Sequence, residues 1–288
     1  MLAPGPLSTV QDRGRPGLGH LGIGRSGAAD RRSLRRANEL VGNAVDAAGI
    51  ETTFGGLRVR FEVDAVVALT GARCVALAGD RPVPFGVAVA VPAGTALRLR
   101  TPGTGVRSYL AVDGGIEVPP VLGSRSTDTL AGLGPAPLTA GMSLPLGPPA
   151  TRDPGLSTAP ATGPTEDQVR AVPRVTLLPG PRRDWFTPAA IGLLYSTDWT
   201  VTPRADRVGI RLAGPALTRR IPGELPSEPM VEGAVQVPPD GQPILFLADH
   251  PVTGGYPVIG VVAAADLPVA AQLRPGGTFR FRPSGAQR

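Results

Sequence analysis

Glycine and proline divide the chain into short pieces. There are 39 glycines and 34 prolines among 288 residues, and they separate short apolar runs without any periodic spacing. This pattern is typical of many short strands joined by tight turns. Hydrophobic residues make up 42% of the chain and aromatic residues only 4%, so we expect a core built from Val, Leu, Ile and Ala. The sequence predicts a mainly β protein with a few short helices.

The apolar runs place the expected strands, and two capping signals place the expected helices. Asp30 is positioned to cap a helix that ends at Gly42, and Asp266 is positioned to cap a second helix over 267–273. The expected strands are 57–62, 65–70, 73–78, 86–91, 95–100, 106–112, 174–178, 199–202, 208–212, 233–237, 243–248, 258–263 and 278–282.

Composition changes most clearly over 147–172. This segment is rich in Pro, Thr, Ala and Gly and has no hydrophobic periodicity. Such a segment is typical of a linker or a disordered loop. We therefore expect two β domains, one over 1–146 and one over 173–288.

The basic residues of this chain are all arginine. The net charge is +6, yet the arginines are scattered and many alternate with apolar residues, as in Leu97–Arg100 and Phe279–Arg282. That alternation predicts half-exposed strands with arginine on the solvent face and does not favour nucleic-acid binding. Without lysine, the chain cannot carry biotin, form a Schiff base or supply the lysine of a phosphate-binding P-loop. If ATP or biotin takes part in the reaction, we expect another chain to supply that machinery.

Cysteine and histidine are both scarce. Cys74 is the only cysteine, which fits a reducing cytoplasm, and its apolar surroundings predict an inert buried thiol. With only His20 and His250, a multi-histidine metal site is excluded. We see neither a signal peptide nor an apolar run long enough for a membrane span, and we expect a cytoplasmic protein without a metal.

Three polar blocks in the N-terminal half are candidate site elements. The run Gln11–Arg15 places a carboxylate beside guanidinium groups, which can hold a carboxylate or carbonyl in two-point contact. Ser26 precedes the first expected helix, whose free N–H groups favour anions. Ser124–Ser126 can hydrogen-bond a planar amide or ureido group. The alternative for each block is a turn or an ordinary helix cap.

Two further blocks lie in the C-terminal half. Asp206-Arg207 and Asp249 stand at the edges of apolar runs, and an aspartate in a partly dry cleft can act as a general base on a ring or urea N–H. The glycine-rich run Thr253–Tyr256 allows close backbone approach to a ligand. The candidate catalytic residues are Asp12, Asp206 and Asp249, and the candidate substrate-binding residues are Gln11, Arg15, Ser26, Ser124, Arg125, Ser126, Arg207, Thr253, Gly254, Gly255 and Tyr256.

Taken in order, the blocks T-V-Q-D-R-G-R-P-G, S-G-A-A-D, A-N-E-L-V-G-N and L-A-V-D-G-G-I-E-V-P-P-V-L-G-S-R-S-T-D resemble the biotin-dependent carboxyltransferase family. Its members include the carboxyltransferase part of urea carboxylase, chains called allophanate hydrolase subunit 2, and the C subunit of 5-oxoprolinase. The resemblance covers roughly 8–282. Ala29 and Arg25 depart from the methionine and proline common in the family, and Arg25 puts the shape of that loop in doubt. The resemblance implies two cyclophilin-like β-barrel domains.

The resemblance also implies a function and partners. The expectation it favours is the C subunit of an ATP-dependent 5-oxoprolinase, which opens 5-oxo-L-proline to L-glutamate together with subunit-A-like and subunit-B-like chains. In this expectation the complex uses ATP, with the nucleotide-binding site not wholly on this chain. One alternative is a carboxyltransferase that moves a carboxyl group from carboxybiotin on another chain to a urea-like substrate. Another is a non-catalytic antagonist of a sporulation-kinase inhibitor.

Overall fold

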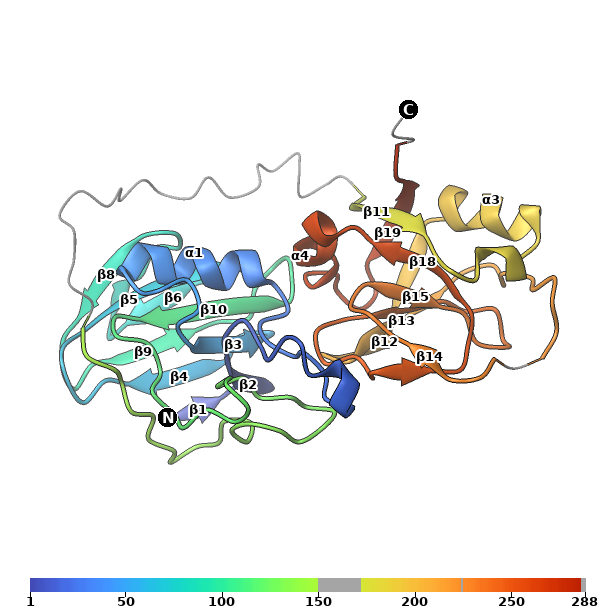
Figure 1. Cartoon of the computed structure of the whole chain (residues 1–288). Helices are drawn as coiled ribbons and strands as arrows, with labels where there is room; N and C mark the ends of the chain where they lie inside the picture. The colour runs from blue at the N-terminus through green and yellow to red at the C-terminus, as the bar shows by residue number, and fades with distance from the viewer. Residues whose placement is uncertain (150–171, 224, 286–288) are drawn as a thin grey trace. The chain divides into compact units, whose positions relative to one another are not determined.

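The computed structural model describes residues 1–149, 172–223 and 225–285, which form two compact units (Figure 1). The first unit contains Met1–Arg15, Ser26–Asp128 and the described residues from Gly132 to 149, and the second contains the C-terminal residues from 172. Two short pieces of the N-terminal half, Pro16–Arg25 and Thr129–Ala131, belong to the second unit. The predicted linker over 147–172 lies outside the described residues except for 147–149 and 172, so the three-part domain division stays a prediction.

Two five-stranded antiparallel sheets build the first unit. Residues from both sheets, such as Leu57 and Leu97 of one and Leu69 and Leu110 of the other, share one buried apolar cluster. The strand order of one sheet is β1 (Ala3–Pro4), β4 (Leu57–Arg60), β9 (Ala96–Leu99), β6 (Ala76–Ala78) and β7 (Arg81–Pro82). The order of the other is β2 (Leu7–Gln11), β3 (Gly49–Thr53), β10 (Arg107–Val112), β5 (Ala65–Gly71) and β8 (Ala88–Val91).

Helix α1 (Arg31–Val41) packs against β5 and β10 of the second of these sheets (Figure 1). The Asp30 side chain accepts a hydrogen bond from the Ser33 N–H, and Gly42 ends the helix in the left-handed conformation at φ 81°. Leu34 and Val41 lie on its buried face. The predicted helix is therefore confirmed, together with both of its caps.

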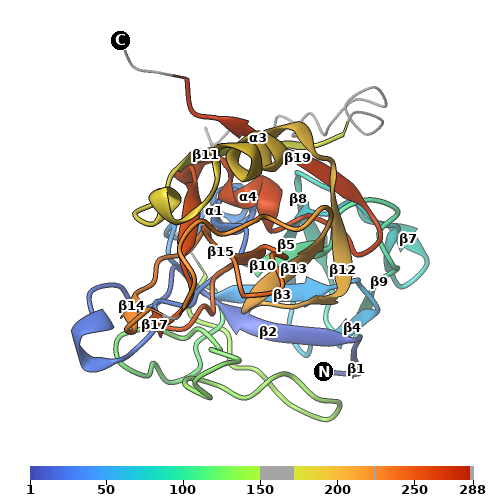
Figure 2. The ribbon, with the colours of Figure 1, turned by 90° about the vertical axis from the view of Figure 1, so that its right-hand side faces the viewer.

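A closed seven-stranded barrel forms the second unit, which Figure 2 shows facing the viewer. Its pairs are antiparallel except β11 with β19, and Trp199 and Phe279 lie fully buried in its core. The order around the barrel is β11 (Arg174–Pro179), β18 (Val258–Val262), β15 (Ala234–Gln236), β16 (Ile244–Phe246), β13 (Gly209–Ala213), β12 (Trp199–Ala205) and β19 (Thr278–Pro283). Helix α3 (Pro188–Ser196) and the small sheet of β14 (Glu228–Pro229) with β17 (Thr253–Gly254) complete it.

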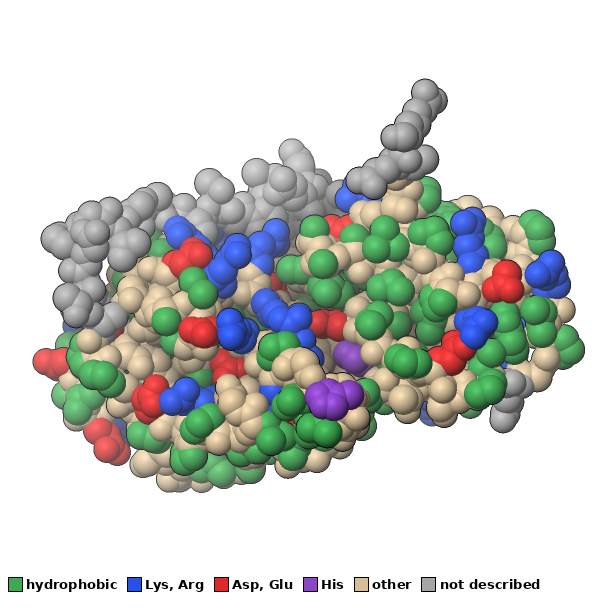
Figure 3. Space-filling view, viewed as in Figure 1, with side chains coloured by type: hydrophobic (Ala, Val, Ile, Leu, Met, Phe, Trp, Pro, Cys, Tyr) green, Lys and Arg blue, Asp and Glu red, His purple; other side chains and the backbone are tan. Residues whose placement is uncertain are grey.

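The mainly β prediction is confirmed, and so is the alternation of arginine with apolar residues. In β4 the apolar residues are buried and the arginines exposed, and in β19 Phe279 and Phe281 are buried whereas Arg280 is half-buried and Arg282 exposed. Figure 3 shows further arginine side chains gathered over α1, where Arg35 pairs with Glu39. No helix among the described residues is long and apolar enough to cross a membrane.

Two secondary-structure predictions are wrong in detail. Asp266 makes no capping bond to the short helix α4 (Leu267–Ala270), because its carboxylate instead accepts the backbone N–H of Thr176, 2.7 Å away. The strand expected over 73–78 begins only at Ala76, which leaves Cys74 half-buried before the strand. Burial raises the pKa of the Cys74 thiol to about 11, so little reactive thiolate forms at neutral pH.

Candidate functional site

Asp12 organises the first unit's polar loops. It follows β2, it is buried, and its carboxylate accepts four hydrogen bonds. Oδ1 accepts the Gly14 N–H at 2.7 Å, the Ser124 hydroxyl at 2.7 Å and the Ser126 hydroxyl at 2.5 Å, and Oδ2 accepts the Arg125 N–H at 2.7 Å. An ionised carboxylate has about four acceptor positions, so these donors fill it. Asp12 therefore holds the Ser124–Ser126 segment against the end of β2.

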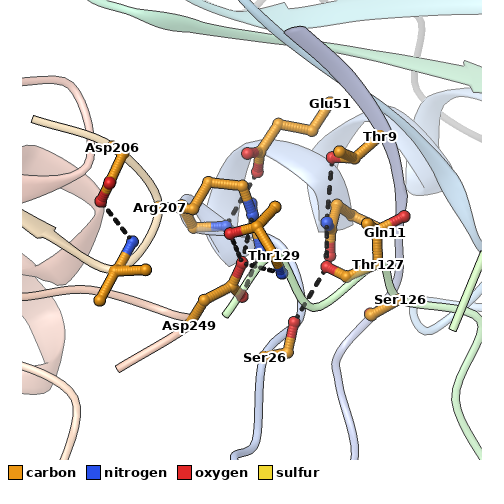
Figure 4. Close-up of polar contacts among 12 residues, drawn as sticks. Thr9, Gln11, Ser26, Glu51, Ser126, Thr127, Thr129, Asp206, Arg207 and Asp249 are labelled. Carbon is orange, nitrogen blue, oxygen red and sulfur yellow. Dashed lines mark hydrogen bonds and ion pairs between the residues drawn. The ribbon is translucent and has the colours of Figure 1, made fainter. Parts of the chain in front are cut away.

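Three candidate side chains meet at two adjacent backbone carbonyls of that loop. The Arg15 guanidinium donates from Nη2 to the Ser126 carbonyl at 2.6 Å. The Thr127 carbonyl accepts both the Gln11 amide, from Nε2 at 2.9 Å, and the Ser26 hydroxyl, at 3.1 Å (Figure 4). All three side chains are buried. The structure thus brings together three of the blocks that the sequence singled out.

Arg125 is the exception in this group. Its backbone N–H contacts Asp12, but its guanidinium turns to its own hairpin. There it donates to the Val118 carbonyl at 2.9 Å and to the Glu117 carboxylate at 2.6 Å. The side chain is therefore part of a local turn in this structure.

The Ser26–Asp30 segment is anchored by residues that the sequence analysis missed. Glu51 accepts the Ala29 N–H at 2.9 Å and the Tyr109 hydroxyl at 2.7 Å, and that hydroxyl accepts the Asp30 N–H at 2.7 Å. Glu51 and Tyr109 are cross-strand partners on β3 and β10. The N–H groups of Ala29 and Asp30, directly ahead of α1, are therefore occupied by the chain's own buried carboxylate and phenol.

In the second unit, Arg207 and Asp249 form a buried ion pair. Arg207 Nε lies 2.9 Å from Asp249 Oδ2, and Nη2 lies 3.0 Å from Oδ1 (Figure 4). Thr129 adds its N–H at 2.9 Å and its hydroxyl at 2.7 Å to the same carboxylate. Although burial opposes the charged form, the Arg207 charge and these hydrogen bonds hold the pKa of Asp249 below its usual value.

The remaining candidates of the second unit lie in a turn, a short strand and a surface loop. Asp206 is exposed, and its carboxylate accepts the N–H groups of Val208 at 2.8 Å and Gly209 at 3.0 Å. Thr253 and Gly254 pair with the strand Glu228–Pro229.

Gly255 and Tyr256 directly follow β17. Tyr256 is partly exposed, and the Arg219 guanidinium lies 5.9 Å from the centre of its ring. Gly255 and Tyr256 therefore belong to a surface loop, which the Arg219 contact stabilises.

Sequence reasoning missed Glu51, Tyr109, Thr127 and Thr129. Each is joined to its partner by strand pairing or by loop contacts far along the chain. Thr127 lies within the quoted G-S-R-S-T-D block, but it acts through its backbone carbonyl, which the residue type does not reveal. Among the described residues, no group of three or more His, Cys, Asp and Glu side chains is arranged to hold a metal.

The fold and the loop arrangement define a carboxyltransferase-type chain. The family described as "Carboxyltransferase domain, subdomain A and B" matches residues 21–283, so the chain belongs to that family. The expected family membership is confirmed.

Within the family, the chain is 41% identical to the C subunit of 5-oxoprolinase from Escherichia coli, over 98% of this chain and 89% of that protein. It is 36% identical to the C subunit of 5-oxoprolinase from Haemophilus influenzae, over 95% and 87%. It is also 32% identical to urea amidolyase of Lachancea kluyveri, covering all of this chain and 17% of that protein.

Two solved structures share the fold. The crystal structure of TTHA0988 superposes with a TM-score of 0.86 at 41% identity, over 98% of this chain. The Kluyveromyces lactis urea amidolyase superposes with a TM-score of 0.90 at 29% identity, also over 98% of this chain. The chain spans about half (55%) of the TTHA0988 chain and 18% of the urea amidolyase chain.

Proposed function

We propose that this chain is the C subunit of an ATP-dependent 5-oxoprolinase, which opens 5-oxo-L-proline to L-glutamate with partner subunits. The observation that carries the proposal is the 41% identity to the Escherichia coli protein named as the C subunit of 5-oxoprolinase, which runs over nearly the full length of both chains. A second relative of the same name supports it at 36% identity. Both relatives are named as subunits, which supports a role within an enzyme complex.

The division of labour follows from the residues present. The chain has no lysine and no P-loop motif, so ATP activation is assigned to subunit-A-like and subunit-B-like partners. In the first unit, Arg15, Ser26 and the Ser124–Ser126 segment are the proposed substrate-binding elements. Guanidinium and hydroxyl donors suit the carboxylate and lactam carbonyl of 5-oxoproline. To bind them, the hydroxyls of Ser26, Ser124 and Ser126 would have to leave the Thr127 carbonyl and the Asp12 carboxylate, to which they donate in this structure.

The candidate bases are constrained by their contacts. The carboxylates of Asp12 and Asp249 each accept four hydrogen bonds, which favours holding loops over abstracting a proton. Asp206 is exposed and its carboxylate caps a turn. A general-base role for any of the three stays a prediction. In the assembled enzyme, Asp249→Asn would lower turnover about a hundredfold or more if Asp249 were the base.

A second function is favoured by the urea-processing relatives. The family is a carboxyltransferase family, and urea amidolyase of Lachancea kluyveri matches across this whole chain. In that alternative, a carboxyl group passes from carboxybiotin on another chain to a urea-like nitrogen. The names of the two relatives that match along most of their own length favour the 5-oxoprolinase assignment instead.

The test is reconstitution. The chain is purified alone and co-purified with subunit-A-like and subunit-B-like chains, and glutamate is measured after addition of 5-oxoproline and ATP. We expect glutamate only from the three-chain mixture and co-elution with the subunit-B-like chain in size-exclusion chromatography. Turnover by the chain alone would overturn the division of labour. Carboxylation of urea with a carboxybiotin donor, without glutamate formation, would select the alternative.

A further inference from the structure

A buried glutamate–tyrosine pair lies directly behind the loop that carries Ser26. We propose that Glu51 and Tyr109 are positioning residues, which fix the backbone of the Ser26–Asp30 segment and thereby the place of the Ser26 hydroxyl. The inference rests on the proposed function, in which Ser26 binds substrate, but the fixing of the segment is measurable without any activity.

Two consecutive backbone N–H groups of the segment end on this pair. Ala29 donates to Glu51 Oε2 at 2.9 Å, and Asp30 donates to the Tyr109 hydroxyl at 2.7 Å. The Tyr109 hydroxyl in turn donates a hydrogen bond to Glu51 Oε2 at 2.7 Å. Both side chains are essentially inaccessible to solvent, at 1% and 0% exposure, so no water competes for these bonds.

Burial and the nearby charges keep the Tyr109 hydroxyl protonated. Burial and the neighbouring carboxylates raise the pKa of the Tyr109 hydroxyl well above its usual value, so it remains a donor at neutral pH. The Arg107 guanidinium lies 3.5 Å from Glu51 Oε1 and balances the buried carboxylate. Tyr109 therefore donates to Glu51 and accepts from Asp30 at the same time.

The segment adopts a backbone conformation that needs such support. Ser26 has φ 53° and Gly27 has φ 94°, and a left-handed non-glycine residue costs about 1–3 kcal/mol unless its surroundings hold it. A Cβ on Gly27 would lie 2.7 Å from the Gly14 nitrogen, so the segment packs directly on the Gln11–Arg15 block. The Ala28 N–H also donates to the Asp12 carbonyl at 2.9 Å.

A purely structural role accounts poorly for this chemistry. A buried ionic group is often no more stabilising than apolar side chains of the same volume, and one attested use of such groups is to select a single conformation. Phenylalanine at 109 would fill the same space beside Ala28 and Leu34, the buried residues that Tyr109 contacts. What phenylalanine cannot do is hold the Asp30 N–H and the Glu51 carboxylate.

The first experiment measures the segment itself. Tyr109→Phe is compared with wild type by amide hydrogen exchange on the purified full chain. We expect exchange of the Ala29 and Asp30 amides to rise about tenfold or more, since a lost hydrogen bond of this kind is worth about 1–2 kcal/mol. Helix α1 should keep its protection. Unchanged exchange at these two amides would overturn the proposal.

The matched control is Thr70→Val. The Thr70 hydroxyl is also buried in the first unit and donates to the Ser33 carbonyl of α1 at 2.7 Å, but it makes no hydrogen bond to the Ser26–Asp30 segment. This variant removes one hydrogen bond of a buried hydroxyl in the same unit, against two in Tyr109→Phe, so it reports the effect of a general loss of stability on the segment. If both variants raise exchange in the segment equally, the effect is structural and the positioning role is refuted.

The second experiment is a double-mutant cycle in the assembled enzyme, with Ser26→Ala, Tyr109→Phe and both together. Each single variant should lower kcat/KM for 5-oxoproline on the order of tenfold, and the double variant should be no worse than Ser26→Ala, because Tyr109 acts through Ser26. Additive losses would refute action through Ser26. If the wild-type complex forms no glutamate, the proposed function fails, and the exchange data alone decide whether the pair fixes the segment.

Discussion

Replacing Asp249 by asparagine is expected to destabilise the second unit strongly. Both side chains of the Arg207–Asp249 pair are inaccessible, at 1% and 0% exposure, so the neutral amide takes away the charge that the buried guanidinium faces. Removing one partner of such a pair typically costs about 3–5 kcal/mol. At roughly 3 °C per kcal/mol for a unit of this size, the melting temperature should fall by about 10 °C. The substitution keeps the shape of the side chain, so the expected loss comes from the removed charge.

The measurement is thermal unfolding of the purified chain, followed by circular dichroism or calorimetry. Asp206→Asn is the matched control, because it makes the same chemical change at an exposed turn whose N–H groups an asparagine oxygen can still accept. Arg207→Met combined with Asp249→Asn should lose less than the sum of the single changes, since the double variant removes both charges of the pair together. If Asp249→Asn melts within about 2 °C of the Asp206→Asn control, the pair is not the buried clamp described here.

Three further outcomes follow from the same structure. The lowered pKa of Asp249 contributes stability that is complete above the ordinary carboxyl value of 3.8 and is lost as pH falls through the folded-state pKa, so the melting gap between wild type and Asp249→Asn should shrink as pH falls below about 4. Cys74, with a pKa of about 11, should react with a thiol reagent at neutral pH on the order of a hundredfold more slowly than free cysteine, measured by absorbance and with the unfolded chain as control. Gly17→Ala should lower the free energy of unfolding by about 1 kcal/mol in a denaturant titration, because Gly17 has φ 87° with open space around it. Gly27→Ala should lower it clearly more, because the added Cβ would meet the Gly14 backbone, and equal losses for the two variants would contradict that contact.

Local signals in the sequence predicted the elements that depend on neighbouring residues. The Asp30 cap, the Gly42 terminator and the apolar face between them lie within a dozen residues, and α1 forms as expected. Strand β2 was missed because Thr9 and Gln11, which read as polar, are buried and hydrogen-bonded to each other. Helix α3 was also missed, although Thr187 with a proline in the first helical turn is a recognisable start signal.

The supporting contacts of the site could not be predicted in this way. Tyr109 faces Glu51 only because of the register between β10 and β3, and a shift of one residue would turn the hydroxyl to the opposite face. Thr129 reaches Asp249 from 120 positions earlier in the chain. A single sequence identifies which loops carry polar residues, but the partner that fixes each loop depends on long-range pairing.

Asp12 and Asp249 share a chemical role that narrows the mechanism. Each carboxylate is buried and accepts four hydrogen bonds, most of them from segments far away in sequence, which is about the full acceptor capacity of the ionised group. A general base needs a lone pair directed at the substrate proton, so either aspartate would have to release a loop donor before it could act. Because the loops around Arg15 and Ser26 depend on the Asp12 donors for their shape, releasing them would also disturb the proposed substrate contacts. The proton acceptor of the proposed reaction is therefore better sought outside these two carboxylates, with the partner subunits as the first place to look.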